Sequence, residues 1–98
     1  MLFRSSLPVG PGIWPAFWAL GTNIDAAGWP ACGEADYMEN VPAVPGGLGP
    51  AIIASTLHAN SASGAYGLGG KYQFASGDVT AMHAYGAIWS AEIGRAHV

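Results

Sequence analysis

Apolar residues dominate the chain, but they do not recur with the period of an amphipathic helix. They fall into short runs separated by glycine and proline, a pattern typical of strands joined by turns. The pattern predicts strands over residues 13–21, 34–41, 52–58, 71–74 and 82–90. The predicted fold class is therefore all-β, a β-sandwich or jelly roll.

Two of these segments carry specific expectations. The run over 13–21 is apolar on both faces; Ile13 and Phe17 are assigned to the core, and Trp14 and Trp18 share the other face. The strand over 52–58 is expected to pair antiparallel with the strand over 34–41. The Gly/Ser/Ala-rich stretch over 59–70 lacks the strand–turn–helix context of a phosphate loop and is interpreted as a surface loop.

The strand over 34–41 holds three of the six acidic residues of the chain: Glu34, Asp36 and Glu39. On a regular strand Glu34 and Asp36 share a face, and Glu39 points the other way. One extra residue in the strand restores Glu39 to that face, and we assign Met38 as this β-bulge residue. The spacing thus predicts three carboxylates in a row.

Carboxylates this close repel one another and are costly to desolvate. Their clustering in a chain with so few charged residues therefore indicates a functional role. Two carboxyl groups about 5–5.5 Å apart serve a retaining glycosidase as nucleophile and general acid/base. A solvated acidic turn and a structural metal site are the alternatives. Trp29, five residues before Glu34, is interpreted as a stacking platform for a sugar ring rather than a lid on the core.

The amino-acid composition limits the classes of molecule that this chain can bind. Only 9% of residues are charged and the net charge is −3, so the chain has no basic surface for nucleic acid or an anionic membrane. No apolar run reaches the roughly 18 residues needed to span a bilayer. Many Gly, Trp and Tyr residues favour a neutral polar polymer such as carbohydrate. Cys32 is the only cysteine, which excludes an internal disulfide.

The histidines leave alternatives open. Two interpretations of His58 are equally compatible with the sequence. It is either a hydrogen-bonded histidine at a strand end or a hydrogen-bond donor that lines the same cleft as the carboxylates. His83, Tyr85 and Trp89 are interpreted as packing residues.

Several motifs now resemble one family in order and spacing. They are Gly12–Gly21 (GIWPAFWALG), Gly28–Pro30 (GWP), Gly33–Val41 (GEADYMENV), Ser55–His58 (STLH) and His83–Trp89. Together they resemble glycoside hydrolase family 16, most closely its bacterial laminarinase (endo-1,3-β-glucanase) branch.

The resemblance implies a jelly roll with a concave glucan cleft and a retaining mechanism. Glu34 would be the nucleophile, Glu39 the general acid/base, and Asp36 an assisting residue between them. Trp29 matches a tryptophan that stacks on glucosyl rings, Trp18 would help to build that wall, and His58 matches a histidine of the cleft. No cofactor and no metal within this chain are implied; a calcium site of the family would lie elsewhere.

Ala35 and Tyr37 depart from the family pattern, which usually has larger aliphatic residues at position 35 and isoleucine at position 37. Length is the greater departure, because family domains are more than twice as long. Residues 1–92 are thus expected to be the middle of a catalytic domain that is incomplete here. Residues 93–98 match the translation of a sequencing adapter, and we expect them to be an assembly artefact.

The resemblance further implies an extracellular protein that is monomeric at full length, although the first residues lack a signal peptide. An enzyme of the same family acting on mixed-linkage glucan, agar or carrageenan is one alternative. A non-catalytic β-glucan-binding protein is the other, although such proteins typically lack the glutamates. The isolated 98-residue chain is expected to aggregate or stay largely unfolded and to be inactive, because open strand edges and an uncovered apolar face leave little stability.

Overall fold

The protein is described by a computed structural model that covers residues 1–41, 47–61, 64–89 and 96–97. Over these residues the protein is nearly all β, with one helical turn. The elements in chain order are β1 (Leu2–Ser5), β2 (Ala16–Leu20), α1 (Ile24–Ala27), β3 (Glu34–Glu39), β4 (Ile52–Ser61), β5 (Gly64–Gln73), β6 (His83–Gly86), β7 (Ile88–Trp89) and β8 (Ala96–His97).

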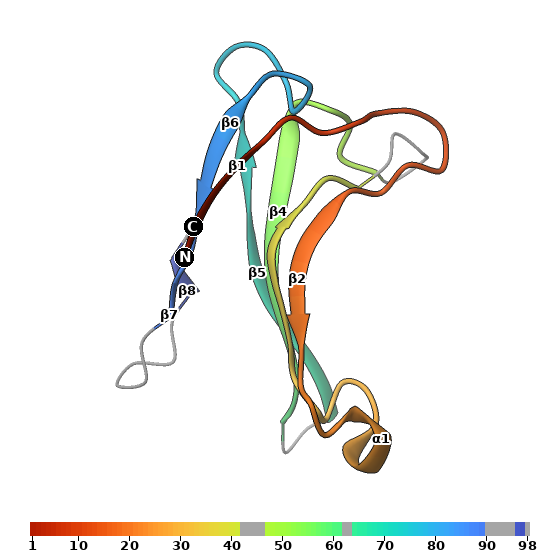
Figure 1. Ribbon diagram of the computed structural model, residues 1–98. Coiled ribbons are helices and arrows are strands. Elements are labelled where there is room, and N and C mark those ends of the chain that lie inside the picture. The colour runs from red at the N-terminus through yellow and green to blue at the C-terminus, as the bar shows by residue number, and fades with distance from the viewer. Residues whose placement is uncertain (42–46, 62–63, 90–95, 98) are drawn as a thin grey trace.

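The largest sheet has four antiparallel strands in the order β2-β3-β4-β5. A two-stranded sheet, β1-β6, forms a second layer beside it, and β7 pairs with β8 (Figure 1). Within the described ranges, no helix has the length and apolarity to cross a bilayer. The predicted boundary between residues 92 and 93 lies outside the described residues.

The predicted strands over 34–41 and 52–58 are confirmed, as is their antiparallel pairing. The first predicted strand begins later, at Ala16, and residues 2–5, for which no strand was predicted, form β1. Residues 42–46, which follow the predicted strand over 34–41, lie outside the described residues.

The loop predicted over 59–70 is wrong, because β4 and β5 form a long hairpin with pairs from Ser61↔Gly64 to Ile52↔Gln73. The glycines of β5 favour a loop by composition, but at Gly69 the neighbouring strand explains the residue. A Cβ there would lie 2.5 Å from the carbonyl oxygen of Ser55. The glycine permits a close approach of two strands rather than a turn.

The hydrophobic core lies between the β1-β6 layer and the Glu39 end of the large sheet. It consists of Leu7, Met38, Ile53, Val79 and Tyr85, with Phe3 and Phe74 packed against them. The prediction of a core position for Ile13 is wrong, because this side chain is 41% exposed. Phe17 is 37% exposed, yet its ring contacts those of Phe3 and Tyr37.

The assignment of His83 and Tyr85 to packing fits the structure, since His83 stacks on Phe74 at 4.3 Å and Tyr85 is buried. The side chain of Trp89 lies outside the described residues.

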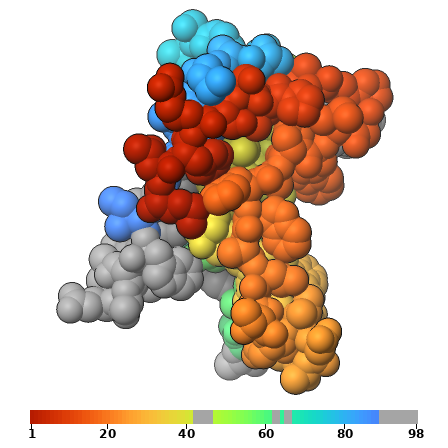
Figure 2. Space-filling view, viewed as in Figure 1, coloured from red at the N-terminus to blue at the C-terminus, as the bar shows by residue number. Residues whose placement is uncertain are grey.

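The opposite end of the same sheet face is open. A groove of about 470 Å³ follows the Glu34 end of β3, and its lining on this face is apolar: Ala19, Ala35, Tyr37, Leu57 and Ala59. Glu34 and His58 also border it. Figure 2 shows the N-terminal residues (red) over the upper part of the molecule. The second layer thus covers only part of the sheet.

Candidate active site

The three carboxylates lie on one face of β3 because the strand is bulged. Asp36 pairs with Thr56 and Glu39 with Ala54, so β3 has one residue more than β4 between these pairs. The predicted bulge is confirmed. Glu34, Asp36 and Glu39 therefore form a row, which we call the acidic row, on the face opposite the core.

The identity of the bulged residue needs correction on the β2 side. There Asp36 pairs with Trp18 and Met38 with Phe17, which leaves Tyr37, not Met38, without a partner. The physical reason is packing. Met38 is 2% exposed and belongs to the core, whereas the ring of Tyr37 lies 5.7 Å from that of Phe17.

Glu34 lies at the start of β3, opposite His58 in register. Its Oε2 accepts a hydrogen bond of 2.5 Å from the indole Nε1–H of Trp29. Trp29 comes from the loop over residues 21–33, which folds tightly on itself. A Cβ at Gly21 would lie 1.9 Å from the carbonyl oxygen of Cys32, so only glycine fits there.

Asp36 is the buried member of the row, with 4% of its surface exposed. Its Oδ2 lies 3.0 Å from Nε2 of His58, and its backbone oxygen accepts a hydrogen bond from Ser55 Oγ at 2.9 Å. Burial is the main reason that the pKa of Asp36 rises from 3.8 to about 6. The charge of Glu39 and the hydrogen bond and charge of Glu34 act in the same direction, whereas His58 opposes them.

Glu39 ends the strand and is held from the other side of the site. Its Oε1 accepts a hydrogen bond of 3.1 Å from the indole Nε1–H of Trp14. The next residue, Asn40, is 3% exposed and its side-chain amide donates to the carbonyl oxygens of Gly49 and Ile52, each at 2.8 Å. These bonds fix the backbone immediately after Glu39.

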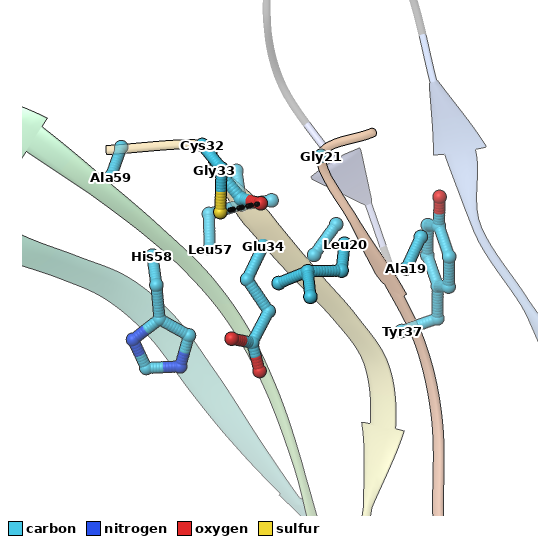
Figure 3. Close-up of a pocket in the computed structure, with 11 residues that line it drawn as sticks. Ala19, Leu20, Gly21, Cys32, Gly33, Glu34, Tyr37, Leu57, His58 and Ala59 are labelled. Atoms are coloured by element: carbon cyan, nitrogen blue, oxygen red, sulfur yellow. Dashed lines mark hydrogen bonds between the residues drawn. The ribbon is translucent and has the colours of Figure 1, made fainter. Parts of the chain in front are cut away.

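The structure brings all the predicted site residues to this face. Trp18 lies opposite Asp36 in register and is 52% exposed. The rings of Trp29 and His58 lie 5.6 Å apart. Glu34 and His58 point toward one another, while Tyr37 points away from them (Figure 3). Both interpretations of His58 hold in part, because it borders the row and is hydrogen-bonded, but within β4 rather than at its end.

Two residues beside the acidic row were not predicted to belong to the site: Trp14, which contacts Glu39, and Asn40, which follows Glu39 in the chain. Trp14 had been placed on the same strand face as Trp18, and this was a usable signal. Pro15 obscured it, because the regular strand begins only at Ala16. For Asn40 no periodic signal exists, since its partners are backbone carbonyls that the fold brings near.

The row also offers donors for a cation. One ligand atom each from Glu34, Asp36 and His58 lie within 4.8 Å of one another. All three residues also take part in the contacts described above. The arrangement thus supports acid–base chemistry directly, with a carboxylate at each end of the row and a partly protonated one between them.

Comparison with known proteins gives similarity to polysaccharide hydrolases over most of the chain. No protein-family model matches it. The glucan endo-1,3-beta-glucosidase A1 of Niallia circulans is 35% identical over 95 residues, which covers 89% of this chain and 12% of that protein. The keratan-sulfate endo-1,4-beta-galactosidase of Sphingobacterium multivorum is 33% identical over 88 residues, covering 89% of this chain and 19% of the relative.

A solved structure extends the similarity to the fold. The endo-beta-1,3-glucanase from Pyrococcus furiosus matches with a TM-score of 0.71 and 41% sequence identity, over 90% of this chain and 33% of that chain. The predicted fold class, an incomplete all-β jelly roll, is confirmed. The chain spans at most about a third of the length of these relatives.

Proposed function

We propose that this chain is the central part of the catalytic domain of a family 16 glycoside hydrolase that cleaves internal β-1,3 bonds of laminarin-type glucans with retention of configuration. The observation that carries the proposal is the acidic row, set on one face by the bulge and flanked by two indole donors. The similarity to endo-1,3-glucanases over about nine-tenths of the chain supports it.

The proposed reaction has two steps. Glu34 attacks the anomeric carbon through the carboxylate oxygen that Trp29 does not contact, while Glu39 gives a proton to the departing glycosidic oxygen. Glu39 then removes a proton from water, and the resulting attack breaks the glycosyl–Glu34 ester. Configuration is inverted twice and therefore retained.

Asp36 acts through Glu34. With its pKa near 6, Asp36 is mostly protonated at pH values below its pKa, and it can then donate this proton in a hydrogen bond to Glu34. His58, 3.0 Å from the other side of Asp36, fixes the orientation of that carboxyl group. Asp36 and His58 are thus positioning residues in this proposal.

Exposed aromatic rings supply the surface for sugar. Trp18 and Trp29 are 52% and 57% exposed and lie on the face that carries the row. Aromatic faces with hydrogen-bonding groups match the alternating apolar and hydroxylated faces of a glucosyl ring. A glucan is neutral, which suits a site that contains three carboxyl groups.

An enzyme for another polysaccharide is the second candidate, favoured by the similarity to a keratan-sulfate hydrolase. The charge of the site argues for the neutral polymer, because sulfate groups would be repelled by the acidic row. We further propose an extracellular location, since the polymer is too large to enter a cell, and a monomeric full-length enzyme.

The test uses the full-length parent chain and laminarin. Proton NMR of the first-formed product should show the β-anomer before mutarotation. An α-anomer would rule out Glu34 as the nucleophile. A panel of mixed-linkage glucan, agar, carrageenan and keratan sulfate, assayed by reducing ends, separates the two candidates: a higher kcat/KM on any of these polymers than on laminarin would replace the proposed substrate.

A further inference from the structure

Trp14 contacts the carboxylate at the end of the row, although it lies outside any strand. Its indole Nε1 donates to Oε1 of Glu39 at 3.1 Å, across 25 positions of sequence. The side chain is 58% exposed, so the contact is not a by-product of burial in the core. The position of this ring therefore calls for a reason other than packing.

The backbone holds the two partners in place. Ala16, two residues after Trp14, pairs with Glu39 in the β2–β3 register. The carbonyl oxygen of Pro15 accepts a hydrogen bond of 3.0 Å from the backbone N–H of Asn40. Trp14 and Glu39 thus project from two segments that are tied together by backbone pairing immediately after Trp14.

The chemistry of the donor gives the contact its meaning. An indole N–H only donates, so the oxygen it meets must offer a lone pair. When Glu39 is protonated, the proton is therefore favoured on Oε2 rather than on Oε1. Building on the proposed function, we propose that Trp14 is a positioning residue that selects the oxygen of Glu39 from which the leaving group receives its proton.

Glu34 has the same arrangement at the other end of the row. The indole Nε1–H of Trp29 donates to its Oε2. The two indoles come from different loops, over residues 6–15 and 21–33, which extend to the same side of the sheet, away from the β1-β6 layer (Figure 1). An indole N–H thus meets one oxygen of each catalytic glutamate.

The test compares two leaving groups in the full-length parent chain. Laminarin has a poor leaving group that needs protonation, whereas a 2,4-dinitrophenyl β-glycoside of laminaribiose does not. For Trp14→Phe we expect kcat on laminarin to fall at least about tenfold with little change in KM. The pre-steady-state release of dinitrophenolate should stay within about twofold of the parent chain, because this step needs no acid.

Parallel variants separate the possible results. Tyr72→Phe changes an exposed aromatic residue on the opposite face and should leave both substrates unaffected. Replacement of Trp14 by 3-benzothienylalanine keeps the shape of the ring and substitutes sulfur for the N–H, so it should reproduce the effect of Trp14→Phe even if that variant folds poorly.

Equal losses on both substrates, or a change in KM alone, would overturn the assignment and make Trp14 a substrate platform. Glu39→Gln distinguishes this failure from failure of the proposed function. If Glu39→Gln shows the leaving-group difference and the Trp14 variants do not, only the role of Trp14 is wrong. If Glu39→Gln shows no such difference, Glu39 is not the acid and both proposals fail.

Discussion

The two faces of the four-stranded sheet are made by the same strands and yet differ in how complete they are. On one face, each carboxyl group of the acidic row has a hydrogen-bond partner within this chain. On the other face, the core around Met38 is closed by the β1-β6 layer, while the groove around Ala35 and Leu57 is open.

The difference follows from the range of the interactions. The carboxyl groups of the acidic row contact only adjacent strands and two loops, all of which lie between residues 6 and 61 of the chain. The apolar face needs a second layer along its whole length. We propose that segments corresponding to those in the longer relatives supply that layer. The catalytic carboxyl groups and the layer that covers the apolar face would then come from different parts of the domain.

The largest effect is expected on the acidic face. Glu34→Gln in the full-length parent chain should lower kcat on laminarin by about 10⁴- to 10⁶-fold, because an amide cannot form the glycosyl ester. Asp25→Asn is the matched control, since it changes an exposed carboxylate in α1. Similar activities of the two variants, measured by reducing-sugar release, would contradict the assignment of the nucleophile.

Next in size is the closed part of the reverse face. Met38→Ala in the full-length parent should lower the free energy of unfolding by about 2–5 kcal/mol, because it leaves a cavity beside Ile53 and Val79. Chemical denaturation measures this loss. Met82→Ala, at an exposed site, is the control. Equal losses for both would show that the core is not where the packing places it.

Asp36 should make stability depend on pH. Its pKa is about 6 in the folded protein and close to 3.8 when unfolded, so the folded state binds more protons between these values. Stability should therefore fall as pH rises from 4 to 6, by up to about 3 kcal/mol from this group. The measurement is the difference in unfolding free energy between Asp36→Asn and the parent chain at pH 4 and pH 7.

Asp36→Asn should gain stability relative to the parent chain between these two pH values. His58→Gln serves as a comparison, because it removes the group that opposes the pKa rise while leaving Asp36 titratable. A difference between Asp36→Asn and the parent that does not vary with pH would show that this carboxyl group titrates normally.

The smallest effect concerns the open part of the reverse face. We expect the isolated 98-residue chain to self-associate through this face, on which Leu68 is 58% exposed. Leu68→Lys should raise the highest protein concentration at which light scattering still detects no aggregates, because the added charge interrupts the apolar surface. Leu2→Lys, on β1, is the control; an equal gain in solubility would place the association elsewhere.

Short-range patterns predicted which carboxyl groups share a face better than they predicted the bounds of the surrounding strands. The spacing of Glu34, Asp36 and Glu39 required one bulge, and the bulge is there. The glycines of β5 misled, because composition does not distinguish a flexible loop from a strand that must pass close to its neighbour. Ile13 misled for a related reason: an apolar residue is buried only where another layer covers it.

By itself, the sequence determined which side chains share a face, since strand alternation and a single inserted residue are local geometry. It thereby determined that three carboxyl groups lie in a row. Only the tertiary structure decided that Tyr37 rather than Met38 is unpaired beside β2, and that Trp14 and Trp29 donate to the two glutamates. Those outcomes depend on packing and on hydrogen bonds between segments far apart in the chain, for which no periodic signal exists.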